Sequence, residues 1–182
     1  MALEFTTSHL KDALAVFRVY KKLGDGAIAQ VADDQLTVVL DTEMNSIAQI
    51  VKHMAGNMRS RWTDFLTTDG EKPNRARETE FVDPPVTRAG VLAMWEAGWQ
   101  LVFAALEPLS DDDLARVVLI RGERHSVMQA INRQMTHYAY HVGQIVLLAK
   151  HFQGAAWRSL SIPRGASTRY EAQVRAGEAS QR

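Results

Sequence analysis

Apolar residues recur at intervals of three and four along four segments of this chain, and this spacing places them on one side of an α-helix. The clearest case follows Thr42, where the apolar positions are Ile47, Ile50, Val51, Met54, Met58, Trp62 and Phe65. A helix with one apolar side must bury that side against other elements. The pattern therefore predicts an all-α chain folded as an up-and-down four-helix bundle.

Capping residues and helix breakers set the expected bounds of these helices. The predicted helices span residues 8–23, 36 or 42 to 66, 87–106 and 127–151. Gly24 and Gly26 are expected to end the first helix, and Thr87 to cap the third. Ser126 and Gln129 have capping-box spacing at the start of the fourth.

Two short elements are expected between the third and fourth helices. Residues 110–115 predict a capped helical turn, and the β-branched run 117–120, followed by Arg121 and Gly122, predicts a short hairpin. Residues 1–160 then form the bundle, and residues 161–182 form a polar C-terminal tail that is expected either to pack loosely or to be partly disordered.

Length and charge exclude several classes of protein. The 182 residues fit one domain, and 21 Lys and Arg balance 21 Asp and Glu, so a nucleic-acid partner is not expected. The chain has no cysteine, which excludes disulfides and thiolate ligands. The apolar stretches fall short of the roughly 20 residues that span a bilayer, and the N-terminus lacks a secretory pattern. We therefore expect a cytoplasmic protein with no membrane partner.

His137 and His141 form the most informative motif. They are four residues apart in the fourth predicted helix, so their imidazoles project from one side, one turn apart, and can reach the same metal ion. A purely structural role for the pair is the alternative.

A third histidine, His53, lies in the second predicted helix, one turn before Asn57. Three neutral imidazoles around one ion leave a coordination position open for water or substrate, as in catalytic zinc sites. A helical projection places all of these residues at the edge of the apolar stripes, which suits a polar cleft and equally suits half-exposed histidines.

At this point the chain resembles a known family. His53 with Asn57, and the run His137-x-x-x-His141-x-Gly143-Gln144, are similar to the DinB/YfiT-like superfamily, and residues 60–65, 69–73 and 161–165 resemble an uncharacterised branch of it. The resemblance implies a four-helix bundle, a zinc or nickel ion held by His53, His137 and His141, and frequent homodimers. It identifies no catalytic residue.

Relatives in that superfamily include thiol-dependent transferases and an isomerase. The resemblance does not settle the activity. The leading hypothesis is a metal-dependent enzyme, either a transferase that adds a low-molecular-weight thiol to a small electrophilic substrate or an isomerase, because a divalent ion lowers the pKa of a coordinated thiol; metal-dependent hydrolysis is a further hypothesis. The alternative is a non-catalytic, stress-related protein that binds a metal or small ligand.

Four other polar residues are candidates for the site. Gln144 can hydrogen-bond a ligand imidazole or a metal-bound water, and Asn57 lies near His53. Arg59 and Arg61 can hold an anionic substrate group, with pairing to Asp64 or Glu71 as the alternative.

A homodimer is also expected on independent grounds. A single bundle is not expected to bury all of the aromatic and Met side chains of the first three helices. Large exposed apolar patches usually mark protein–protein interfaces. The residues concerned include Phe17, Met58, Trp62, Trp95 and Trp99.

Overall fold

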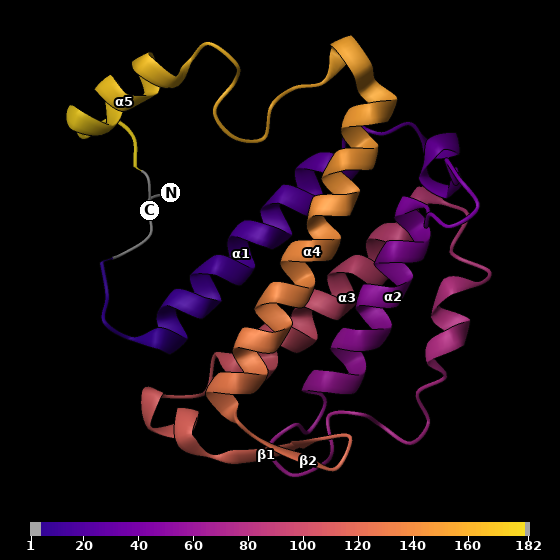
Figure 1. Ribbon diagram of the computed structural model, residues 1–182, viewed down its shortest axis with the longest axis vertical. Coiled ribbons are helices and arrows are strands. Elements are labelled where there is room, and N and C mark those ends of the chain that lie inside the picture. Colours follow the sequence, from indigo (N-terminus) through magenta and orange to yellow (C-terminus); the bar gives the residue numbers. More distant parts are fainter. Residues whose placement is uncertain (1–4, 181–182) are drawn as a thin grey trace.

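Four long helices form an up-and-down bundle in the computed structural model, which describes residues 5–180 (Figure 1). The predicted all-α class is confirmed. The bundle helices are α1 (His9–Ile28), α2 (Ile47–Trp62), α3 (Arg88–Leu106) and α4 (Val127–Gln153). The smaller elements are η1 (Asp33–Thr37), η2 (Arg77–Phe81), η3 (Asp111–Ala115), β1 (Val117–Ile120), β2 (Glu123–Ser126), η4 (Gly154–Ala156) and α5 (Ser167–Arg175).

Side-chain caps fix where the bundle helices begin. The predicted caps of α3 and α4 are confirmed: Thr87 accepts a hydrogen bond from the Gly90 amide, and Ser126 forms a capping box with Gln129. The second helix is shorter than predicted. It begins after Ser46, whose side chain accepts from the Gln49 amide at 3.2 Å, because this box satisfies the first free amides of the helix.

The first helix is longer than predicted, because Gly24 and Gly26 lie inside α1 and do not end it. A Cβ atom at Gly24 would overlap the indole ring of Trp95, which is 1% exposed. The glycine is therefore needed for the close approach of α1 to α3, and the packing outweighs its weak helix propensity.

The core is built around aromatic rings that meet edge to face. The ring centroids of Phe17 and Trp99 are 6.2 Å apart, and those of Trp99 and Tyr138 are 5.6 Å apart, a geometry that aromatic quadrupoles favour. Phe17, Met58, Trp62, Trp95 and Trp99 are all buried within one chain. These residues therefore contribute no exposed apolar surface of the kind from which we predicted a homodimer. The oligomeric state stays a prediction that rests on the resemblance alone.

The predicted hairpin is present between η3 and α4. β1 and β2 pair antiparallel, with Ile120 opposite Glu123, and Arg121 and Gly122 both have positive φ, of 55° and 77°, as a type I′ turn requires. Asp69 accepts hydrogen bonds from both turn amides, at 2.8 and 2.7 Å. This contact ties the loop after α2 to the hairpin.

Two further features correct the expectations from sequence. The C-terminal segment contains a helix, α5, which has no buried residue and stands away from the bundle in Figure 1.

By length and composition alone, α3 is long and apolar enough to cross a membrane. Trp95 and Trp99 of α3 are buried in the bundle core, as in a core helix of a folded domain.

The close contact at Gly24 gives a test of this packing. We expect Gly24→Ala to lower the free energy of unfolding by about 1–3 kcal/mol, because the new methyl group displaces a fully buried indole. Gly143→Ala is the matched control, because a Cβ there has no neighbour within 4 Å and Ala favours a helix by about 1 kcal/mol. Urea unfolding of both metal-free variants measures the difference, and equal stabilities would contradict the packing described here.

Candidate metal centre

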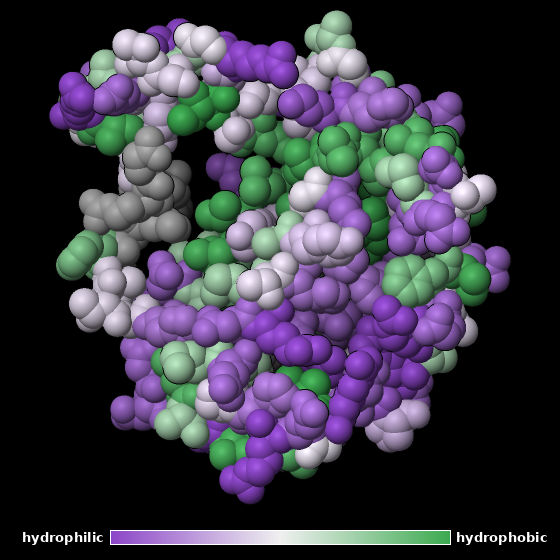
Figure 2. Space-filling model, viewed as in Figure 1, coloured by the Kyte–Doolittle hydropathy of each residue, from purple (hydrophilic) through white to green (hydrophobic). Residues whose placement is uncertain are grey.

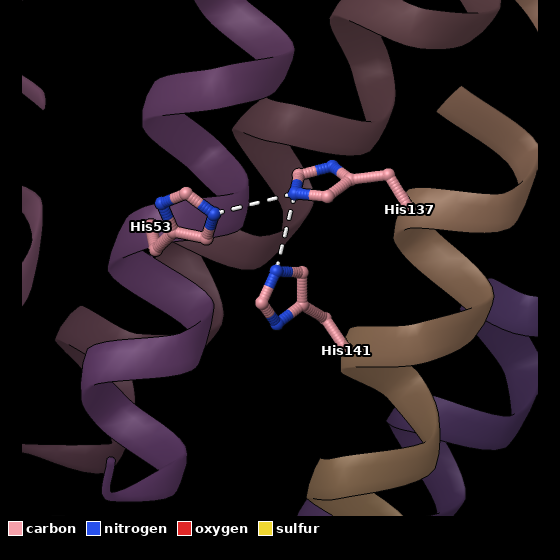
Figure 3. A group of neighbouring side chains, drawn as sticks. All are labelled: His53, His137 and His141. Carbon is pink, nitrogen blue, oxygen red and sulfur yellow. Dashed lines mark hydrogen bonds between the residues drawn. The ribbon is translucent and has the colours of Figure 1, made fainter. Parts of the chain in front are cut away.

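Three histidines from two helices point into the space between α2 and α4 (Figure 3). His53 comes from α2, and His137 and His141 come from successive turns of α4. His53 is 4% exposed, whereas the two α4 histidines are half-buried. The four-residue spacing seen in the sequence thus places both α4 rings opposite the α2 ring.

The three imidazoles converge through their Nε2 atoms. His137 Nε2 lies 3.4 Å from His53 Nε2 and 3.1 Å from His141 Nε2, and ligand atoms of all three residues lie within 4.8 Å of one another. Two nitrogens bound to one tetrahedral zinc, each at about 2.0–2.1 Å, are about 3.3 Å apart. The spacing of the two short pairs therefore fits the coordination edge of a single ion.

Hydrogen bonds on the opposite side of two rings determine which nitrogen carries the proton. His53 Nδ1–H donates to Glu80 Oε2 at 2.8 Å, and His141 Nδ1–H donates to Gln144 Oε1 at 2.9 Å. Both Nε2 atoms then carry a lone pair directed at His137. One N–H of His137 can satisfy only one of them, so a cation fits this arrangement better than the three rings alone.

His137 differs from the other two rings in its surroundings. Its Nδ1 is buried and has no hydrogen-bond partner among the described residues. Burial and the neighbouring His141 and His53 lower the pKa of His137 from 6.5 to about 3. Burial also lowers the pKa of His141 to about 4. Both rings are therefore neutral near pH 7, the form in which imidazole binds metals.

Glu80 is a site residue that the sequence analysis missed. It lies in η2, is 6% exposed, and also accepts from Nε and Nη2 of Arg75, both at 2.8 Å. Burial opposes its ionisation, but the hydrogen bonds from His53 and Arg75 outweigh that effect and hold the pKa of Glu80 below its ordinary value. Gly56 makes room for it, because a Cβ there would overlap the carboxylate.

A cavity of about 630 Å³ opens beside the three histidines. Of the other candidates from sequence, Asn57, Gln144 and Arg61 line it. Asn57 accepts a hydrogen bond from the Tyr138 hydroxyl at 3.2 Å. Arg61 donates to the Gly70 carbonyl at 2.6 Å and lies 3.3 Å from Glu71, so the predicted pairing with Glu71 is present. Arg59 is exposed and lines a different pocket.

The remaining histidines lie outside this cavity. His9, His125 and His151 are absent from its lining. His125 lies in β2, which continues up to the Ser126 cap of α4.

Comparison with known proteins adds one match. The model of a family described as a protein of unknown function, DUF1572, matches residues 4–166. No curated protein and no solved structure matches the chain. The matched range includes all four bundle helices and the three histidines.

The lowered histidine pKa values predict how the metal-free protein responds to pH. The fold favours neutral His137 and His141, so their contribution is complete above the unfolded pKa of about 6.5 and is lost as the pH falls towards the folded values of about 3 and 4. Between pH 6.5 and 5, we expect the free energy of unfolding to fall by about 2 kcal/mol, half of the full linkage value because both rings are partly exposed.

Urea unfolding at several pH values measures this slope. Carboxylates with ordinary or lowered pKa values stay largely ionised in that window, so they contribute little to it. The double variant His137→Ala/His141→Ala should lose most of the slope. A slope that the double variant retains would show that other groups produce it.

The bond between Glu80 and His53 gives a second test. Glu80→Gln keeps an acceptor for His53 but removes the charge, and we expect a 10–100-fold loss of zinc affinity. Glu78→Gln is the matched control, two residues away in η2, with a side chain that is 88% exposed. Competition with a chromophoric chelator measures both. If the two variants bound zinc alike, Glu80 would have no role in positioning His53.

Proposed function

The chain belongs to the DUF1572 family, and we propose that it is a divalent-metal-binding protein that holds one zinc or nickel ion through His53, His137 and His141. The convergence of three Nε2 atoms at the spacing of a coordination edge supports this proposal most directly. Neutral imidazoles suit borderline metals such as zinc and nickel. The similarity to the DinB/YfiT-like superfamily points to the same three ligands.

We further propose that the protein is a transferase that adds a low-molecular-weight thiol to an electrophilic substrate. A bound divalent ion with an open coordination position lowers the pKa of a coordinated thiol or water. The cavity of about 630 Å³ beside the histidines has the volume of a small-molecule site. The chain has no cysteine, so any thiol must come from a substrate.

The chain's own residues have distinct tasks in this proposal. Glu80 and Gln144 orient two of the rings, so that their Nε2 lone pairs face the ion. Phe81 stacks on His53 with ring centroids 4.7 Å apart, and Tyr140 lines the same cavity. These two rings give the cavity apolar surface on which the body of a substrate can pack.

Alanine variants of the ligands test the metal site. We expect His53→Ala, His137→Ala and His141→Ala each to abolish stoichiometric metal binding and to keep the helical fold, because packing supplies most of the stability of the bundle. Loss of the ion should cost roughly 3–4 kcal/mol when the metal is present at several hundred times its dissociation constant. Elemental analysis and circular dichroism measure the two effects.

His151→Ala serves as the control, because this exposed ring near the end of α4 lies outside the cavity. It should bind metal normally. Metal retained by His53→Ala, or lost by His151→Ala, would contradict the ligand assignment. If metal-loaded protein showed no turnover with any low-molecular-weight thiol and a reactive electrophile, the transferase proposal would give way to that of a non-catalytic metal or ligand-binding protein.

A further inference from the structure

Guanidinium groups from four parts of the chain line the cavity beside the histidines. They come from α2, from the segment that includes η2, from the hairpin turn and from α4, and they are Arg61, Arg75, Arg77, Arg121 and Arg133. No Asp or Glu is among the described residues that line it. Figure 2 shows that hydrophilic side chains cover the lower half of this face of the molecule, over the hairpin and the lower parts of α2 and α4.

Two of these arginines already form ion pairs with acidic residues of the protein. The side chains of Arg61 and Arg75 are each 5% exposed, and both lie against Glu71, at 3.3 and 3.2 Å. Arg75 is also held by Glu80. Their charge still reaches the cavity, because buried charges are weakly screened.

The other three arginines are exposed and less engaged. The Arg133 guanidinium has no hydrogen bond or ion pair to any residue within 5–180, although its backbone carbonyl accepts from the Thr136 hydroxyl. Arg77 pairs with Glu78, whose side chain is 88% exposed, and its guanidinium lies 5.4 Å from the centre of the Phe81 ring. Arg121 reaches Glu71 at 3.3 Å, an oxygen that it shares with Arg61 and Arg75. Arg133 and Arg77 are therefore the guanidiniums most available to a ligand.

Their positions relative to the histidines also suit a ligand. Arg133 precedes His137 by one turn of α4, so the two side chains project from the same side of the helix. Arg77 begins η2, the element that also holds Phe81 against His53. Two residues of the lining, Arg61 and Gln134, each have one buried polar atom, Nε and Oε1, with no partner among the described residues.

We propose that this cavity binds the oxyanion group, a carboxylate or a phosphate, of a small organic substrate, and that Arg133 and Arg77 receive it. Guanidinium matches both oxyanions with two parallel hydrogen bonds. A volume of about 630 Å³ exceeds what an inorganic ion fills, so the ligand also has an organic body. The inference deepens the proposed function, on which it rests for placing the reacting group near the histidines.

Equilibrium binding of simple probes tests this inference separately from catalysis. Titration calorimetry at low salt would compare succinate, its neutral analogue succinamide, and inorganic phosphate, on metal-free and on zinc-loaded protein. We expect succinate or phosphate to bind in both forms and succinamide to bind at least tenfold more weakly. The tighter of the two anions identifies the carboxylate or phosphate source.

Variants assign the binding to the arginines. Arg133→Gln and Arg77→Gln should each weaken anion binding about fivefold to tenfold. Lys150→Gln removes the same charge from the far end of α4 and should leave binding unchanged. The inference is overturned if neither anion binds, if succinamide binds equally well, or if binding requires zinc and ignores both arginine variants. Failure to find thiol transfer would leave all of these results unaffected.

Discussion

A buried series of hydrogen bonds between α2 and α4 sets the geometry on which the cluster of three histidines depends. Trp62 Nε1–H donates to the Tyr138 hydroxyl at 2.9 Å, and that hydroxyl donates to Asn57 at 3.2 Å. Tyr138 is fully buried, and burial raises the pKa of its hydroxyl above its ordinary value, so the group stays a neutral donor. Unpaired polar groups in the buried core cost free energy. These hydrogen bonds therefore fix the position of α4 along the axis of α2. His137, the residue before Tyr138, is thereby held opposite His53.

The loop between α2 and α3 supplies the other half of the site. Glu80 orients His53 from one side, while Arg75 and Arg77 extend the same segment towards the cavity. The Glu80 carboxylate lies behind the His53 ring, and the guanidiniums line the cavity. Negative and positive charges therefore lie in two separate layers. The inner layer favours a cation and the outer layer favours an anion, so the metal ion and the anionic substrate that we propose would be bound by different residues of one cavity.

Much of this arrangement could be predicted from sequence, and the remainder depends on contacts between distant residues. Helical periodicity and the caps at Thr87 and Ser126 are local signals, and the spacing of His137 and His141 is local as well. Gly24 was misread as a helix end because its role depends on Trp95, about seventy positions later in the chain. Glu80 gave no signal, since a lone acid in a polar linker resembles any solvated residue until the fold brings it to His53.

The loop after α2 is held to the rest of the fold through the backbone of Gly70, and this has a consequence for how the chain tolerates insertions. The Gly70 amide donates to the Leu119 carbonyl at 2.7 Å, and the Gly70 carbonyl accepts from Ser60 and Arg61 at 2.9 and 2.6 Å. These hydrogen bonds divide the long connection between α2 and α3 into shorter loops. Closing each of the shorter loops costs little conformational entropy. Insertions after Asp83 would then lengthen a loop outside these contacts, whereas insertions between Asp69 and Val82 would move the partner of His53. Sequence length should vary among relatives after Asp83 and stay constant between Asp69 and Val82.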